Sequence, residues 1–316
     1  MSAFKEAIAR EVRKELMNPE FDSRRSKNGG RVFWVKLATA TGFAQFVKEH
    51  PPYDDNVAAV HETMSGAAAA VVADRGDEVR ITEGYVLTLP GPFCLATSGV
   101  RWVGEGHGTK VPVFTVQNAT HGISLDAAGV ELDNVRFAAP STDEALSMIR
   151  IKGAGCKVQN IVGIGSDGAK NFVDCITVGL GSHDLELKNI RLTSLGGAPV
   201  GTFLTFENPI SRFFSAGFYA SGSVGTAGVV DDANANLGDA IISNWRIAVG
   251  GVAKPALTLD ATKGKGIVTD CHFAGTHGTL ANNAQFAGDW RLSQVYVSEE
   301  TGNVAQGALI PAVDAD

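Results

Sequence analysis

The chain has 316 residues, of which 37 are glycine, and its hydrophobic fraction of 44 % is large beside a charged fraction of 19 %. This composition excludes a disordered chain and favours a β-rich architecture with many turns over a helix bundle. The net charge of −7 argues against nucleic-acid binding, and no apolar run is long enough to span a membrane. The N-terminus lacks the apolar core of a signal peptide, so we expect no Sec-dependent export.

Residues 1–30 are predicted to form an N-terminal arm with a helix and a linker. Apolar residues recur at every fourth position over 3–17, which indicates a helix with one narrow apolar stripe. Asn18-Pro19 ends this helix, and a polar, glycine-terminated linker follows over 22–30. The stripe needs a partner surface, which is the body of the chain, a sister copy or another protein. The candidate capsid or subunit contacts are Phe4, Ile8, Val12, Leu16, Arg10, Arg13, Lys14, Arg24 and Arg25.

Charge is divided unevenly between the arm and the rest of the chain. Residues 1–36 carry nine basic and five acidic side chains, a net charge of +4. Because the whole chain has a net charge of −7, the remaining residues carry −11. This division of charge suggests that the basic arm binds to another surface.

Residues 31–76 are predicted to form a helical cap region. A short helix is expected over 43–49, where Pro51-Pro52 stops it. A longer, alanine-rich helix is expected over 57–72 and would cover the end of the following domain. The residues on its apolar face are Val57, Val60, Met64, Ala67 and Val71.

One pattern recurs along residues 77–300: apolar, any, apolar, polar, Asn-like, apolar, any, apolar. Its Asn-like positions lie 26, 29, 55, 26 and 24 residues apart, and a weak copy at Gly217 divides the 55 into 28 and 27. The full copies centre on Asn134, Asn160, Asn189, Asn244, Asp270 and Gln294.

A period near 27 residues is typical of one coil of a parallel β-helix with three short strands and three turns. We therefore predict an all-β, right-handed single-stranded parallel β-helix of about eight coils over 77–300, with a C-terminal tail over 301–316. Asn tolerates the left-handed conformation of a tight turn, so the recurring Asn would stack at one turn of successive coils. No helix is expected after Asp77.

A second strand type keeps a similar period, over 113–116, 148–151, 175–178, 203–206 and 256–259. Strict alternation places one apolar column of this strand type on the outside of the coil. Such a column is covered either by loops or by a neighbouring subunit, and it is the candidate oligomer face. Its members are Val113, Met148, Cys175, Phe203 and Ala256.

A further column, two residues after each Asn-like position, is predicted to face outward. Its basic and aromatic side chains could stack on sugar rings or meet an acidic protein surface. The alternative is a solvated face on which arginine stems cover apolar neighbours. The column consists of Arg136, Val162, Arg191, Tyr219, Arg246, His272 and Tyr296.

No set of residues predicts catalysis, a cofactor or a metal. A glycosidase needs two carboxylates at a defined separation, but Lys157 lies between Glu131 and Glu186 in register. His183-Asp184 with Arg191 is the nearest arrangement to a site, and a turn explains it equally well. The glycine-rich segments 104–108 and 163–168 are predicted to be turns, and the four scattered cysteines are predicted to be buried thiols.

Two segments carry a resemblance to known families. The stretch from Val60 to Tyr85 (VHETMSGAAAAVVADRGDEVRITEGY) resembles the start of pectin-lyase-like right-handed β-helices, which frequently begin with an alanine-rich helix, Gly-Asp and an apolar strand. The stretch from Phe43 to Asn56 (FAQFVKEHPPYDDN) resembles segments that precede this fold in tailed-bacteriophage virion proteins.

The resemblance implies a non-enzymatic virion protein, made in the host cytoplasm, that decorates or cements the capsid. It implies a homotrimer bound to the major capsid protein or another virion protein, and a surface glycan is a further candidate partner. The net charge and the lack of a long apolar run argue against nucleic acid and membrane as partners. The alternative is a receptor-binding tailspike or a depolymerase that acts on cell-surface polysaccharide, and a bacterial carbohydrate-active β-helix enzyme is a third possibility.

Overall fold

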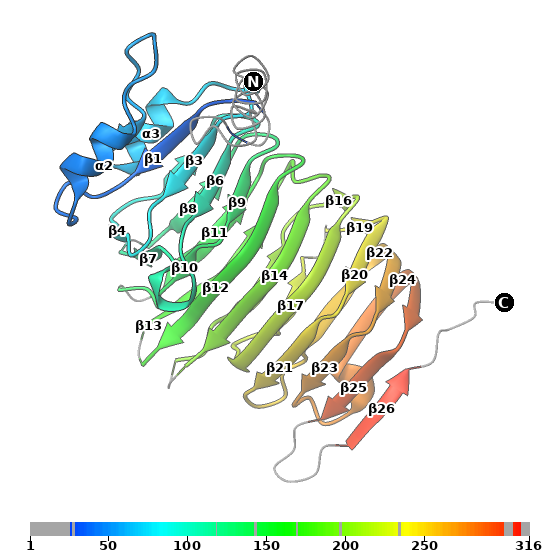
Figure 1. The fold of residues 1–316 in the computed structure, drawn as a ribbon. Helices are drawn as coiled ribbons and strands as arrows, with labels where there is room; N and C mark the ends of the chain where they lie inside the picture. The colour runs from blue at the N-terminus through cyan, green and yellow to red at the C-terminus, as the bar shows by residue number, and fades with distance from the viewer. Residues whose placement is uncertain are drawn as a thin grey trace, which may run out of the picture.

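The computed structural model describes residues 26, 29–117, 119–141, 144–168, 170–195, 198–232, 235–299 and 306–310. The predicted arm helix over 3–17, and with it every predicted contact residue of the arm, lies outside these residues. The described chain forms a parallel β-helix of about nine turns (Figure 1). The predicted fold class is therefore confirmed, and the right hand is the one that parallel crossover connections adopt almost without exception.

The β-helix begins earlier in the chain than residue 77. Strand β1 (Val32–Val35) pairs in parallel with β3 (Glu78–Ile81), with Val32 opposite Glu78. All four residues of β1 are buried, because β1 is the first strand of the stack and not part of a separate helical region. The predicted boundary between a cap over 31–76 and a β-helix from 77 is therefore wrong.

Two short helices lie beside this first strand (Figure 1). Helix α2 (Phe43–Glu49) has the predicted bounds. Helix α3 (Met64–Ala70) is shorter than predicted, because β2 (Val60–His61) pairs with β1 instead of continuing the helix. The hydroxyl of Thr63 caps α3 by accepting a hydrogen bond from the Gly66 amide at 3.1 Å, and Met64 is buried in the core.

Each coil contributes strands to three faces, and equivalent strands of successive coils form parallel ladders. We call each position of a ladder a rung. The first face continues from β1 and β3 through β6 (Arg101–Gly104), β9 (Glu131–Asp133), β12 (Lys157–Asp167), β14 (Glu186–Ser194), β17 (Phe214–Ser223), β20 (Ala240–Ser243), β22 (Leu257–Thr269) and β24 (Ala284–Ser293).

The other two faces follow the same order along the axis. The second face contains β4 (Val86–Leu89), β7 (Val113–Val116), β10 (Arg136–Phe137), the later parts of β12, β14 and β17, and then β21 (Arg246–Gly250), β23 (His272–Gly275) and β25 (Val295–Glu299). The third contains β5 (Phe93–Leu95), β8 (His121–Leu125), β11 (Ala145–Ile151), β13 (Lys170–Val178), β15 (Thr202–Phe206), β18 (Val229–Asp231) and the first parts of β22 and β24.

The recurring Asn-like residues form the sharp bend between the first and second faces, as predicted. All six full copies have a φ between 50° and 56°, and Gly217 of the weak copy has a φ of 71°. Left-handed backbone lets the chain turn within a single residue, which Asn, Asp and Gly tolerate better than other residues. The bend therefore explains both the period and the residue type.

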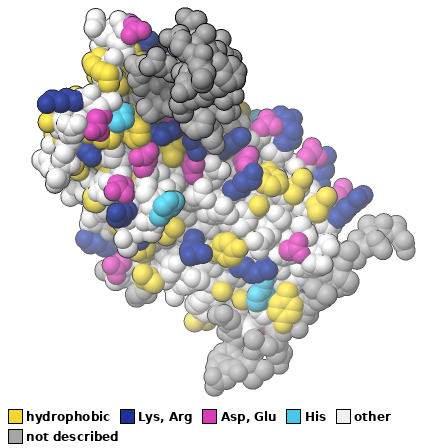
Figure 2. Space-filling view, viewed as in Figure 1, with side chains coloured by type: hydrophobic (Ala, Val, Ile, Leu, Met, Phe, Trp, Pro, Cys, Tyr) yellow, Lys and Arg dark blue, Asp and Glu magenta, His cyan; other side chains and the backbone are white. Residues whose placement is uncertain are grey.

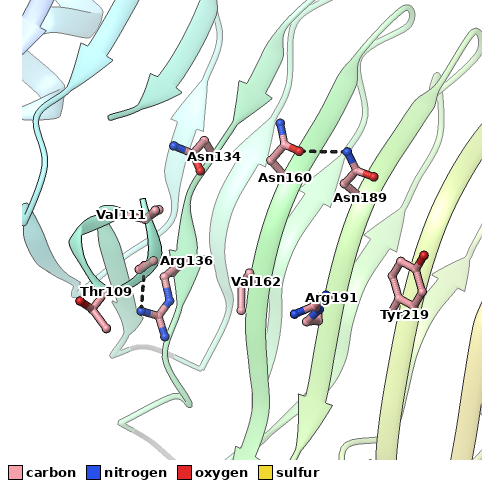
Figure 3. A pocket seen from close by; sticks show the side chains of 10 residues that line it. Thr109, Val111, Asn134, Arg136, Asn160, Val162, Asn189, Arg191 and Tyr219 are labelled. Atoms are coloured by element: carbon pink, nitrogen blue, oxygen red, sulfur yellow. Dashed lines mark hydrogen bonds between the residues drawn. The ribbon is translucent and has the colours of Figure 1, made fainter. Parts of the chain in front are cut away.

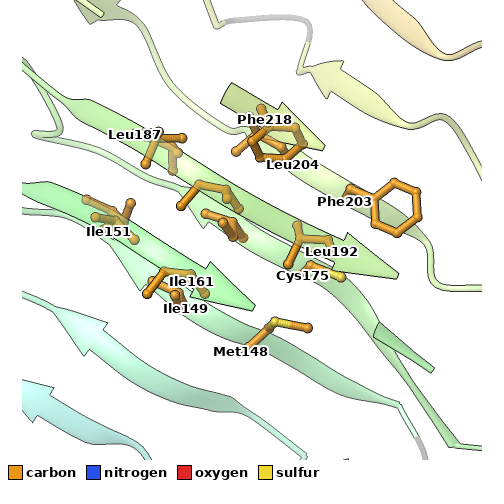
Figure 4. Packing of buried hydrophobic residues seen from close by; sticks show 14 of the residues in the cluster. Met148, Ile149, Ile151, Ile161, Cys175, Leu187, Leu192, Phe203, Leu204 and Phe218 are labelled. Carbon is orange, nitrogen blue, oxygen red and sulfur yellow. The ribbon is translucent and has the colours of Figure 1, made fainter. Parts of the chain in front are cut away.

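The proposed outward column of the second strand type lies in the core, so the prediction of an oligomer face there is wrong. Met148, Cys175, Phe203 and Ala256 are each 0 % exposed. Consecutive side chains such as Cys175 and Ile176 are both buried. The register pairs Asp174 and Ile176 with the neighbouring strands but skips Cys175, so the in-out alternation is broken at this residue. Figure 4 shows Met148, Cys175 and Phe203 of this row in the core together with Ile149 and Leu204.

Inward-facing glycines make room for this row. A Cβ on Gly163 would lie 2.6 Å from Sδ of Met148, and a Cβ on Gly165 would lie 2.8 Å from Sγ of Cys175. Both glycines belong to the middle of β12, so the prediction that the segment 163–168 is a turn fails for them and holds for Gly168, whose φ is 65°.

Val113 belongs to a different face from the other four members of the column. Strand β7 pairs with β10, with Val113 opposite Arg136. The true counterpart of β11 in the preceding coil is β8, with Ile123 opposite Ile149. The irregular spacing of 35 residues after Val116 reflects this mismatch of strand type.

The remaining elements lie at the edge and the C-terminal end of the stack. Strand β26 (Gln306–Ile310) pairs antiparallel with β25 and so covers an edge that would otherwise invite pairing with another chain. Helix α4 (Leu280–Asn283) is a helix where none was predicted. The others are the 3₁₀ turn η1 (Gly108–Lys110) and the pair β16 (Ile210–Ser211) and β19 (Leu237–Gly238).

Ion pairs stabilise the first face near its N-terminal end. Arg101, whose side chain is 15 % exposed, contacts Glu78 at 2.8 Å, Glu131 at 2.9 Å and Asp133 at 2.5 Å. Burial lowers the pKa of Arg101, but the hydrogen bonds and charges of Glu78 and Glu131 outweigh it and raise the pKa overall. One guanidinium thus connects three successive coils.

Candidate functional site: an arginine and tyrosine groove

The predicted outward column forms one continuous ladder on the second face, which we call the stripe. Each of its members is paired in register with the next, so that Arg136 lies opposite Val162 and Val162 opposite Arg191. The ladder continues through Tyr219, Arg246, His272 and Tyr296. All seven side chains are exposed or half-exposed, which confirms the predicted orientation.

A groove of about 690 Å³ follows the N-terminal part of the stripe. Figure 3 shows Arg136, Val162, Arg191 and Tyr219 side by side in one row, with Asn134, Asn160 and Asn189 in a parallel row. Thr109 and Val111 line the groove near its N-terminal end. The amide row was predicted as a turn element, and its contribution to the groove was not.

A second hollow of about 310 Å³ continues the groove toward the C-terminus. The two share Arg191 and Tyr219, and the second extends to Arg246 and His272. Its lining includes the small side chains of Thr193, Ser221 and Ala248, which lie two residues beyond the stripe on three successive rungs. In Figure 2, basic, hydrophobic and histidine side chains alternate in a row over this part of the face.

Contacts within the stripe hold its aromatic side chains in place. The Asn244 side-chain amide donates a hydrogen bond to the Tyr219 hydroxyl at 2.9 Å, and the Arg191 guanidinium lies 6.0 Å from the centre of the Tyr219 ring. His272 and Tyr296 pack edge to face at 4.8 Å. The rings are therefore positioned before any ligand arrives, which lowers the entropy that binding must overcome.

The arginines of the stripe differ from most other arginines of the described chain. Six of the ten arginines there form ion pairs with carboxylates: Arg31, Arg75, Arg80, Arg101, Arg150 and Arg212. Within the same residues, Arg136, Arg191 and Arg246 form none, and Arg291 is the fourth of this kind. Three guanidinium groups without a carboxylate partner therefore line a single groove on an acidic protein.

A polar cluster on the third face is the other candidate for chemistry. Arg150 can only donate, so its 3.1 Å contact with Nε2 of His121 leaves the ring proton on Nδ1, which faces Oγ of Ser147 at 2.8 Å. Burial and the nearby charges of Arg150 and Lys152 lower the pKa of His121. Ser147 is 0 % exposed, and its Oγ accepts a hydrogen bond from His121 instead of donating one to it, so His121 is not placed to activate Ser147 as a nucleophile.

Asp174 lies beside this cluster, opposite Ser147 in the ladder. Its Oδ1 accepts hydrogen bonds from Thr202 at 2.5 Å and from Thr205 at 2.9 Å. Burial raises the pKa of Asp174 although these hydrogen bonds oppose the shift. The arrangement satisfies a poorly solvated carboxyl group within the sheet.

The suggested site at His183-Asp184 with Arg191 is not assembled in the structure. Asp184 forms an ion pair with Arg212 instead of Arg191, and the Arg212 guanidinium donates to Oδ2 of Asp184 at 2.6 Å. Cys156, Cys175 and Cys271 are buried as predicted, with the pKa of Cys156 and Cys271 raised by burial to about 11, whereas Cys94 is exposed.

The residues that the structure describes contain neither a metal-binding cluster nor a membrane-spanning helix. They contain no group of three or more His, Cys, Asp or Glu side chains able to hold a metal ion. They also contain no helix with the length and apolar character needed to cross a membrane.

Comparisons of the chain with known protein families, with curated proteins and with solved structures find no match.

Proposed function

We propose that the chain is a non-enzymatic structural protein of a tailed-phage particle, specifically a capsid decoration or cement protein. The observation that carries the proposal is the division of charge, +4 over residues 1–36 against −11 over the rest. A basic, amphipathic segment joined to an acidic body suits attachment to a second surface by charge pairing and apolar burial. The resemblance of residues 43–56 to segments of phage virion proteins supports the same role.

The body has the properties that a projecting structural element needs. Its parallel ladders run through about nine turns, and every coil is hydrogen-bonded to the next, which makes the body a stiff rod. Attachment through many weak contacts gains strength when several copies bind together. We therefore keep a homotrimer on the major capsid protein, or on another virion protein, as part of the proposal.

An apolar row on the outer side of the first face is the candidate contact between subunits. Phe214, Ile241 and Ile267 are successive neighbours on the outer side of the first face, and the two isoleucines are each 44 % exposed. An apolar row that reaches solvent is a candidate subunit contact. Sedimentation of the native chain and of Ile241→Lys tests it: a trimer that Ile241→Lys dissociates supports the contact, and a monomeric native protein contradicts it.

Removal of the arm tests the attachment proposal. A chain that lacks residues 1–25 of the arm, and so keeps the hydrogen bond from Ser26 to the Gly76 carbonyl, should retain the far-ultraviolet circular dichroism and the melting temperature of the body. It should no longer co-sediment with particles that lack the protein. A matched variant with Arg10, Arg13 and Lys14 changed to Glu should lose binding in the same way. Particle binding retained by both variants would overturn the role of the arm.

A receptor-binding tailspike or depolymerase is the second candidate, and the groove on the second face favours it. Arginine and tyrosine side chains are suited to contacts with sugars. Incubation with host capsule or lipopolysaccharide separates the two functions. New reducing ends or unsaturated uronates would establish a depolymerase, whereas intact polymer with particle binding supports the decoration protein.

A further inference from the structure

We propose that the groove of the second face binds an extended acidic polysaccharide that carries a carboxylate on every second sugar. The ligand would lie along the β-helix axis, with one sugar over each rung from Arg136 to Arg246. This inference concerns binding without cleavage, and it does not depend on the place of the protein in a particle.

The spacing of the rungs sets the size of the repeat that fits. Neighbouring strands of a sheet lie about 4.8 Å apart, which is close to the advance of one pyranose unit in an extended polysaccharide. Arg136 and Arg191 are two rungs apart, as are Arg191 and Arg246. Guanidinium groups therefore recur about every 9.6 Å, the advance of two sugars.

The rungs between the arginines carry uncharged side chains suited to neutral sugars. Val162 lies between the first two arginines, and Tyr219, with its ring held by Asn244 and Arg191, lies between the second and third. Aromatic and aliphatic surfaces pack against the apolar face of a sugar ring. The sequence of charged and uncharged rungs thus alternates with the same period as the proposed ligand.

Hydrogen-bonding groups flank the row on both sides. Asn134, Asn160 and Asn189 line one side of the groove, and Thr193 and Ser221 line the other. Amides and hydroxyls both donate and accept, which matches the hydroxyl groups of a polysaccharide. Because Arg136, Arg191 and Arg246 have no carboxylate partner within the described residues, a bound carboxylate would form charge-assisted hydrogen bonds with them.

An acidic peptide fits the same charges less well. Side chains on one face of an extended peptide repeat at about 6.7 Å, which does not match the two-rung interval. Consecutive acidic side chains of such a peptide would therefore fall out of register with arginines that lie two rungs apart, so the observations favour the polysaccharide.

Calorimetry with the full chain tests the proposal. The probes are a hyaluronan hexasaccharide, which has an acid on every second sugar, a neutral chitin hexasaccharide and a glutamate hexapeptide. We expect saturable binding of the hyaluronan probe, at least about fivefold tighter than either other probe and weakened by added salt. Equal or tighter binding of the glutamate peptide would assign the groove to an acidic protein, and no hyaluronan binding would overturn the proposal.

Matched arginine variants locate the binding. Arg191→Ala should weaken hyaluronan binding at least about fivefold, whereas Arg291→Ala, which removes an arginine that also lacks a carboxylate partner but lies outside the groove, should change it less than about twofold. Equal effects of the two variants would contradict the groove. Unchanged melting temperatures exclude unfolding as the cause, because both side chains are exposed.

The two-rung repeat has a test of its own. Val162→Arg places a charge on a rung that faces a neutral sugar of hyaluronan. This variant should bind polygalacturonate, which has an acid on every sugar, at least about threefold more tightly than the native chain, with less than about twofold change for hyaluronan. A larger gain for hyaluronan than for polygalacturonate would contradict the proposed register.

Discussion

The side-chain amide of Asn189 donates a hydrogen bond of 3.1 Å to Oδ1 of Asn160, its equivalent one coil earlier. Asn160 in turn donates to Oδ1 of Asp133 at 2.8 Å. Both asparagines are in the left-handed conformation, so each amide joins a bend to the coil before it. The sharpest turn of the coil is thus also a cross-link between coils.

Asn189→Ala should lower the free energy of unfolding by about 1–2 kcal/mol, because alanine is strained at a φ of 50°. Asn189→Gly loses the same hydrogen bond without the strain, and Gly217 occupies the equivalent bend of the next coil. We expect the glycine variant to lie closer to the native protein than the alanine variant. Urea denaturation of the three proteins measures this order, and a more stable alanine variant would contradict it.

Arg101→Ala should lower the free energy of unfolding by about 3 kcal/mol. The carboxylate of Glu78 is only 2 % exposed, and without Arg101 its charge would be paired with Arg80 alone. Arg291→Ala is the matched control, since this exposed arginine has no carboxylate partner among the described residues, and it should change stability by less than about 0.5 kcal/mol. Denaturant midpoints at low and high salt measure both. Similar losses in the two variants would show that the Arg101 network contributes little.

Gly165→Ala should destabilise the protein by about 2 kcal/mol, because its Cβ would lie 2.8 Å from Sγ of the buried Cys175. Cys175→Ala removes that sulfur atom and leaves room for the new methyl group. The double variant should therefore be less destabilised than the sum of the single variants, as a double-mutant cycle measures. Strict additivity would mean that the glycine does not serve to accommodate Cys175.

Asp174→Asn should flatten the dependence of stability on pH. Because burial raises the pKa of Asp174 in the folded state, the folded protein holds this proton more tightly than the unfolded chain does. The associated stability is present below the ordinary aspartate pKa and is lost as pH rises through the raised pKa. Asparagine keeps an oxygen that accepts from Thr202 and Thr205.

Melting temperatures of the native protein and Asp174→Asn between acid and neutral pH check this. The melting temperature of the variant should rise relative to that of the native protein as pH increases. A constant difference between the two melting temperatures across the range would argue that Asp174 titrates normally. Glu186→Gln, at a carboxylate that forms surface ion pairs on the first face, serves as the control variant.

The coil and its bend could be predicted from the order of the residues. Asn recurs near every 27 residues at a position where the backbone is left-handed. Such a period can be recognised in the sequence because it reflects the local conformation of each residue. The outward direction of Arg191 and Tyr219 followed from the same register. Local steric rules and strand alternation suffice for these features.

The way in which the coil closes depends on contacts between strands that are far apart in the sequence. Met148 and Cys175 are buried beside Ile149 and Ile176, because the in-out alternation is broken at these two residues, which the ladder register skips. Room for them comes from Gly163 and Gly165, which lie close in space but in a different strand. In-out alternation of side chains holds for a regular strand. Where it is broken and the space is provided by glycines of another strand, the sequence shows no periodic signal.

The residues of the stripe could be predicted from the sequence, but the groove and its unpaired charges could not. The stripe follows from one coil at a time, but the lack of carboxylate partners around Arg136, Arg191 and Arg246 depends on where acids from all three faces lie. Ion pairing across coils connects Arg101 to Glu78 and Glu131 on the first face. Packing of the faces, rather than composition, therefore left three arginines of an acidic protein without a carboxylate partner, among the residues that the structure describes, along one groove.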